Sequence, residues 1–117
     1  MAPFVFEPDA QPQADLTDAD RRLLRSIYAA DTAKVIAALE DGADVNAADP
    51  VTGLTALHIA VGTNNLHLTR ILVEDWEAVF KPDGKGRWPT VIAAEAQVDP
   101  ILADYIADAE DQALNAE

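Results

Sequence analysis

Apolar residues recur along most of the chain at the spacing of one helix face. Val35, Ile36 and Leu39 form one such set, and Leu68, Ile71 and Leu72 form another. This spacing is typical of amphipathic helices, whereas strands alternate at every second residue. The pattern therefore predicts an all-α fold, with helices near residues 18–30, 32–41, 55–62, 65–75, 89–96 and 100–112.

Several residues mark where these helices start and stop. Thr55 is expected to cap a helix start, because its hydroxyl oxygen can accept a backbone N–H. Gly42 and Asn64 are expected just beyond helix ends, since both residue types tolerate the left-handed conformation. Asp99 and Pro100 are expected as the cap and first residue of the last helix, because proline there loses no hydrogen bond.

Two segments of the chain repeat at a regular interval. Gly53-Leu-Thr-Ala-Leu-His-Ile-Ala60 matches Gly86-Arg-Trp-Pro-Thr-Val-Ile-Ala93 at an offset of 33 residues. The helical segments that begin at Asp31 and Asn65 match at an offset of 34. We place the one-residue difference in the turn 49–53, because loops accept insertions at little cost.

The first of these lines resembles the ankyrin repeat, whose signature is Thr-Pro-Leu-His-x-Ala at a 33-residue period. Ala56 replaces the usual proline, and the second line departs further, with Trp76, Phe80 and Trp88 replacing the family's Gly, Asn and Thr. The resemblance covers about residues 20–110 and implies an α-solenoid of about three helix–turn–helix repeats. We expect an extended or docking tail over 1–16, a repeat domain over 17–112 (units about 17–52, 53–85 and 86–112) and a flexible tail over 113–117.

The N-terminal tail carries two opposing signals. Its prolines argue against a helix, yet Phe4, Val5 and Phe6 form an apolar run. Either these residues pack along the first unit, or they form a docking strand for a partner.

Charge limits the classes of partner. The net charge is −13, and residues 90–117 carry seven acids and no Lys or Arg. This charge repels nucleic acid and anionic lipid, and it attracts a basic protein; the alternative is that it serves solubility alone. The absence of cysteine, signal peptide and membrane span leads us to expect a cytoplasmic protein that binds neither nucleic acid directly nor membrane.

No catalytic, metal or cofactor site is expected. By the resemblance, His58 is a structural residue that ties the helix start to neighbouring turns, and His67 is expected to be solvated. The chain has only these two histidines and no cysteine, so it lacks the ligands of a zinc site. Ser26, the only serine, has no nucleophile-elbow motif. We predict that the protein is not an enzyme.

Partner contacts are expected at the turn tips and first helices, as in the family that the chain resembles. Aromatic residues and arginine are enriched at binding hot spots, and they gather in the second junction. The alternative for the tryptophans and Phe80 is that they fill space between units, and for Asn64 that it is a simple turn residue. The candidate contact residues are Phe4, Phe6, Val51, Thr52, Asn64, Trp76, Phe80, Lys81, Asp83, Lys85, Arg87 and Trp88.

The functional hypothesis follows from repeat, size and charge. The chain is expected to bind one protein and to neutralise or regulate it. In this it resembles the compact bacterial antitoxin or immunity proteins, whose partner would be a basic toxin or effector. The alternative is a scaffold or adaptor without inhibitory action, and a homodimer remains open.

Overall fold

The computed structural model describes Phe4 and residues 16–115. Over this part of the chain the regular secondary structure is helical, apart from one isolated bridge between Ala48 and Thr55. The helices are α1 (Asp18–Tyr28), α2 (Thr32–Glu40), α3 (Ala56–Gly62), α4 (Leu66–Arg70), which continues into the π-helical turn η1 (Ile71–Asp75), α5 (Pro89–Ala96) and α6 (Pro100–Asn115).

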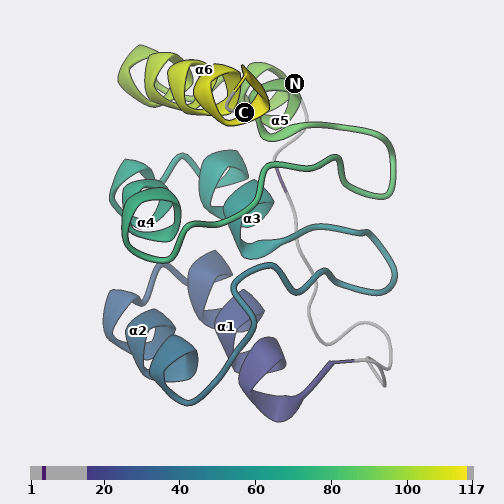
Figure 1. Cartoon of the computed structure of the whole chain (residues 1–117), viewed down its shortest axis with the longest axis vertical. Helices are drawn as coiled ribbons and strands as arrows, with labels where there is room; N and C mark the ends of the chain where they lie inside the picture. Colours follow the sequence, from purple (N-terminus) through teal and green to yellow (C-terminus); the bar gives the residue numbers. More distant parts are fainter. Residues whose placement is uncertain (1–3, 5–15, 116–117) are drawn as a thin grey trace.

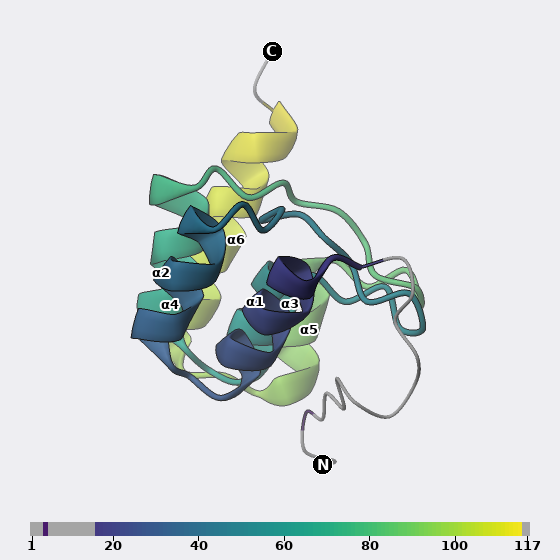
Figure 2. The same ribbon diagram turned by 90° about the horizontal axis from the view of Figure 1, so that it is seen from below.

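The helices form three pairs that stack on one another. In Figure 1 the pairs α1/α2, α3/α4 and α5/α6 lie in successive layers, and two long turns project to the same side. Figure 2 looks along the stack and shows α1, α3 and α5 in an inner row, with α2, α4 and α6 in an outer row. The predicted all-α stack of helix pairs is confirmed.

Capping residues define the helix starts. Thr17 and Thr55 each head a capping box, in which the cap hydroxyl accepts a backbone N–H and the third residue's side chain accepts in return. The predicted cap at Thr55 is therefore confirmed, with His58 as its reciprocal partner. Gly42 and Asn64 follow helix ends with φ of 102° and 61°, as their predicted left-handed conformation requires.

The second unit absorbs an additional residue in its outer helix. Twelve positions separate the left-handed residues Ala30 and Gly42, whereas thirteen separate Asn64 and Glu77. The π-helical turn η1 accommodates the additional residue, because a π-turn takes in one residue more than an α-turn. The turn 49–53 is also one residue longer than its counterpart 83–86: the N–H of Gly53 bonds the carbonyl of Asp49 four positions back, and the N–H of Gly86 bonds that of Asp83 three positions back. This confirms the predicted insertion in the turn 49–53, beside the additional residue in η1.

An apolar seam runs through the stack. The middle helix α3 is buried along its whole length, and Ala60 is small enough to let the neighbouring helices approach. This seam holds the three pairs together. The largest fully buried apolar side chains are Leu23, Leu24, Ile27, Val35, Leu57, Ile59, Leu68, Leu72, Ile92, Leu102 and Ile106.

The structure changes two predicted boundaries. Leu16, which we assigned to the tail, is only 8% exposed and belongs to the core. Helix α6 continues to Asn115, so residues 113–115 are helical rather than part of a flexible tail. The rest of both predicted tails, Phe6 included, lies outside the described residues, with the exception of Phe4.

Polar side chains also link the second pair to the third. Tyr105 on α6 donates a hydrogen bond of 2.6 Å to Glu74 on η1. Partial burial and this hydrogen bond raise the pKa of Tyr105 to about 12, so its hydroxyl keeps its proton at neutral pH. The amide oxygen of Asn64 accepts a hydrogen bond from the backbone N–H of Asp99. These contacts fix the spacing of the two pairs away from the projecting turns.

None of the helices in residues 16–115 is long and apolar enough to cross a membrane.

Candidate functional site

Two turns project from the stack (Figure 1), and we call them finger 1 (residues 48–55) and finger 2 (residues 82–88). Each contains a buried aspartate. In finger 1 one carboxylate oxygen of Asp49 accepts hydrogen bonds from the backbone N–H of Val51 and from both the N–H and the hydroxyl of Thr52, at 3.2, 2.9 and 2.9 Å. An aspartate that bonds its own turn in this way replaces a regular backbone hydrogen-bond pattern. The turn therefore has a fixed shape although its tip is exposed.

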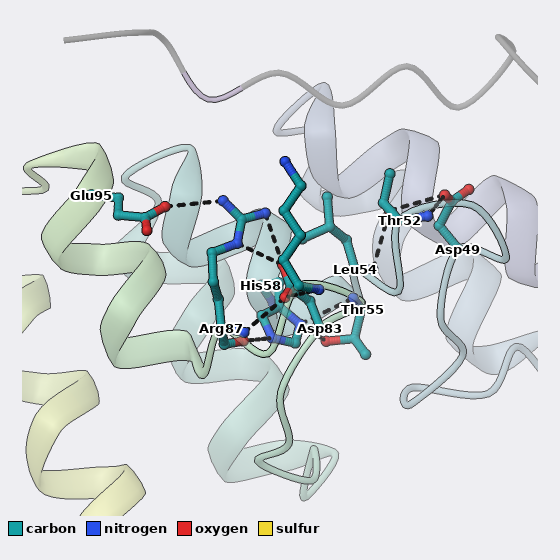
Figure 3. Close-up of polar contacts among 9 residues, drawn as sticks. Asp49, Thr52, Leu54, Thr55, His58, Asp83, Arg87 and Glu95 are labelled. Atoms are coloured by element: carbon teal, nitrogen blue, oxygen red, sulfur yellow. Dashed lines mark hydrogen bonds and ion pairs between the residues drawn. The ribbon is translucent and has the colours of Figure 1, made fainter.

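Finger 2 repeats this arrangement with an added ion pair. Asp83 accepts hydrogen bonds of 2.9 Å from the backbone N–H groups of Lys85 and Arg87. The Arg87 guanidinium lies 2.8 Å from the Asp83 carboxylate and 3.0 Å from that of Glu95 (Figure 3). Burial alone would raise the pKa of Asp83, but the hydrogen bonds from Arg87 outweigh burial and lower it. Asp83 thus stays charged and braces the turn.

The fingers are joined to each other through backbone atoms. The N–H of Gly84 donates a hydrogen bond of 2.9 Å to the carbonyl of Thr52. A side chain on Gly53 would collide with the backbone N of Gly84, so the close approach needs a glycine at this position. The two fingers therefore form one continuous surface.

His58 connects the second finger to the inner helix row. Its Nδ1 accepts hydrogen bonds at 3.2 and 2.9 Å from the backbone N–H and the hydroxyl of Thr55, and its Nε2 lies 3.0 Å from the carbonyl of Arg87. A carbonyl can only accept, so Nε2 must carry the proton. Burial lowers the pKa of His58, which keeps the ring neutral. The predicted tie between a helix start and a neighbouring turn is confirmed (Figure 3).

The comparisons with known proteins agree with this geometry. The family model "Ankyrin repeat" matches residues 52–83, which run from the second half of finger 1 through α3, α4 and η1 to the start of finger 2. This segment of the chain is an ankyrin repeat. It is also 29% identical over 86 residues to the 2-5A-dependent ribonuclease of Mus musculus; the match covers 74% of this chain and 12% of that protein. Ankyrin repeats are protein–protein interaction modules.

The contact residues predicted from the sequence fall into an exposed set and a buried set. Val51 is 59% exposed, and Thr52 and Lys85 are also exposed, so these side chains can meet a partner. Asp83 is buried, with its side chain wholly covered, and it acts inside finger 2. Arg87 is half-buried between two carboxylates. Contact with a partner stays a prediction for the exposed members of this set.

The aromatic residues of the second junction lie closer to the core than to the finger tips. Trp76 and Phe80 are half-buried and pack against the core cluster, as expected if they fill space between units. Trp88 is half-buried at the start of α5. Lys81 donates a hydrogen bond to the carbonyl of Asn46, which ties the two connecting segments together. Asn64 is exposed beyond α3.

A pocket of about 510 Å³, which we call the groove, lies between the two fingers and is also lined by Phe4. Apolar atoms of Phe4, Val51 and Leu54 form part of its lining, and Lys85 and Arg87 bring two basic side chains to it. The described residues contain no cluster of three His, Asp or Glu side chains that could hold a metal ion. What this groove offers chemically is shape, apolar surface and hydrogen-bonding groups, which is the chemistry of binding.

Sequence reasoning missed two residues that shape the groove. Asp49 has the same role as Asp83, and its signal is the Asp-x-x-Thr-Gly pattern at the tip of the first turn. Gly62 lies directly beneath the ring of Phe4. No sequence pattern marks this contact, because a glycine within a helix has no side chain to show periodicity.

Proposed function

We propose that the protein binds a single protein partner in the groove between the two fingers, and that binding neutralises or regulates that partner. The observation that carries this proposal is that the fingers combine fixed backbones with exposed side chains. Their backbones are held by buried Asp49 and Asp83, while side chains such as Val51 and Lys85 face solvent. A surface already held in its binding shape loses less conformational entropy when a partner docks.

Charge supports a basic partner. Acidic residues outnumber basic ones by 21 to 8, and the net charge is −13. Opposite charge accelerates encounter and favours specific pairing between proteins. A basic toxin or effector that acts on nucleic acid fits this charge, and covering its active surface would neutralise it. The ribonuclease relative is matched over 12% of its length, and we carry no ribonuclease activity over to this chain.

The experiment compares two changes of the same kind on different faces. Val51→Arg adds bulk and positive charge to finger 1, where Val51 is 59% exposed. Ile101→Arg adds the same group to the outer helix α6, where Ile101 is 72% exposed. In affinity capture from the native source, we expect wild type and Ile101→Arg to retain one basic protein, and Val51→Arg to lose it by at least about tenfold in affinity.

Other outcomes would contradict the proposal in different ways. Equal retention by both variants would show that the partner does not use the fingers. Recovery of only acidic proteins would contradict the charge argument. For neutralisation, deletion of the gene should be harmful only in cells that contain the partner; harm without the partner would favour the scaffold alternative.

A further inference from the structure

The groove of the free protein contains an aromatic side chain from the same chain. Phe4 is half-buried and packs against the core cluster. It also forms part of the lining of the 510 Å³ pocket, together with residues of both fingers. Phe4 is 58 positions before Gly62, yet its ring lies directly against that residue. The described part of the chain thus brings an N-terminal aromatic residue to the surface that we assign to a partner.

The fit at Gly62 is specific to a residue without a side chain. A Cβ built on Gly62 would lie 2.5, 2.6 and 2.7 Å from three ring carbons of Phe4, and all three are side-chain atoms. Such distances are too short for carbon atoms, which pack at about 3.5–4.0 Å. The missing side chain at the end of α3 therefore creates the socket that the ring occupies. We call the surface of Gly62 under the ring the aromatic socket.

Glycine has a cost in this position. Gly62 is the last residue of α3 and has no left-handed φ that would call for glycine. Within a helix, glycine is less favourable than alanine. Helix stability alone favours alanine here, whereas ring packing requires glycine.

We propose that Phe4 is an internal plug of the binding groove, and that a protein partner engages by placing an aromatic side chain of its own in the aromatic socket. This inference deepens the proposed function and rests on it. Burying one phenylalanine against a protein surface contributes only a modest free energy. A partner that makes further contacts with the fingers can therefore displace it.

The contact itself is tested by a double-mutant cycle on the full chain, with Phe4→Ala, Gly62→Ala and the double variant. In the wild-type background, Gly62→Ala should lower the folding equilibrium constant by about threefold or more, because its methyl group pushes out the ring. In the Phe4→Ala background the same change should raise that constant by about threefold, because alanine is the better helix former. The same effect in both backgrounds would overturn the contact.

Displacement is tested with a synthetic peptide of residues 1–15 as the aromatic segment. It is added at about millimolar concentration, which suits a weak single-anchor contact, to isotope-labelled full-length wild type and Phe4→Ala. We expect the Gly62 amide resonance to shift in Phe4→Ala and to shift at least about fivefold less in wild type, where the plug competes at high effective concentration. A scrambled peptide and the double variant Phe4→Ala/Gly62→Ala are the controls, and neither should give the shift.

Each remaining result has a clear meaning. Equal shifts in wild type and Phe4→Ala would overturn the plug, since the socket would be open in both. No shift in either protein would overturn displacement and leave Phe4 as a fixed part of the core. Failure of either test with a finger-dependent partner still captured would reject the plug and keep the proposed function. If the cycle and the peptide test are both positive but no finger-dependent partner is captured, the plug is kept and the proposed function is rejected.

Discussion

The Nε2 atom of His58 and the carbonyl oxygen of Arg87 lie 3.0 Å apart, although 29 positions separate the two residues in the sequence. The hydrogen bond joins the first turn of α3 to finger 2. On the other side of the ring, Nδ1 is held by Thr55, so both nitrogens of a fully buried imidazole have partners. One side chain therefore fixes a helix start and the neighbouring finger together.

Replacing His58 is expected to destabilise the fold. His58→Ala should lower the free energy of unfolding by about 3 kcal/mol, because it leaves the Arg87 carbonyl without its partner and opens a buried cavity. Chemical denaturation followed by circular dichroism measures this. His67→Ala, at an exposed position, is the control and should change stability by no more than about 0.5 kcal/mol. Similar losses in both variants would contradict the bracing role of His58.

His58 also makes stability depend on pH. Burial lowers its pKa in the folded state below the ordinary histidine value of 6.5, so the unfolded chain takes up a proton that the folded chain resists. The contribution is complete above that value and is lost as pH falls toward the folded-state pKa, by at most about 1.4 kcal/mol per pH unit.

Denaturation measured between about pH 7 and pH 5, above the range where most carboxylates titrate, should show this decline in wild type. His58→Gln removes the titrating group, and its unfolding free energy should be nearly flat over the same range. A wild-type profile that is flat, or that rises toward acid pH, would show that the folded state does not resist protonation at His58.

Two glycines with positive φ allow the stability cost of backbone strain to be measured separately from the cost of disturbing the contact between the fingers. Gly42 has a φ of 102° and nothing near its missing Cβ, so Gly42→Ala should cost about 1 kcal/mol from strain alone. Gly53 has a φ of 75° and also touches the backbone of Gly84, so Gly53→Ala should cost at least about 1 kcal/mol more, on the scale of overpacking.

Hydrogen exchange identifies the cause of the larger loss. The N–H of Gly84 donates to Thr52 across the fingers, and its exchange should accelerate in Gly53→Ala but not in Gly42→Ala. Equal acceleration in the two variants would mean that the fingers are not held by this close approach.

Local signals made most of the fold predictable. Helix positions followed from apolar spacing, and the start at Thr55 and the left-handed residues Gly42 and Asn64 followed from their residue types. Each of these features depends on atoms only a few positions apart. The π-turn η1 was not predictable in this way, because the same apolar spacing can continue through an α- or a π-turn.

The candidate groove was predictable only in part. Val51, Thr52 and Lys85 were expected at turn tips, and the structure places them on the exposed fingers. Asp83 looked equally exposed from its turn position, yet the Arg87 guanidinium covers it. Whether a charged turn residue faces solvent or braces the turn depends on which side chain folds over it, and residue type does not show this.

The sequence by itself determined the helix pairs and their interval, because periodicity, caps and a repeated line act over short stretches. The structural role of His58 followed from the resemblance to the ankyrin repeat. Tertiary structure alone decided that the ring of Phe4 meets the bare backbone of Gly62, 58 positions away. The physical reason is that a glycine contact is defined by an absent side chain. It becomes visible only when packing brings another group into the space that the side chain would have filled.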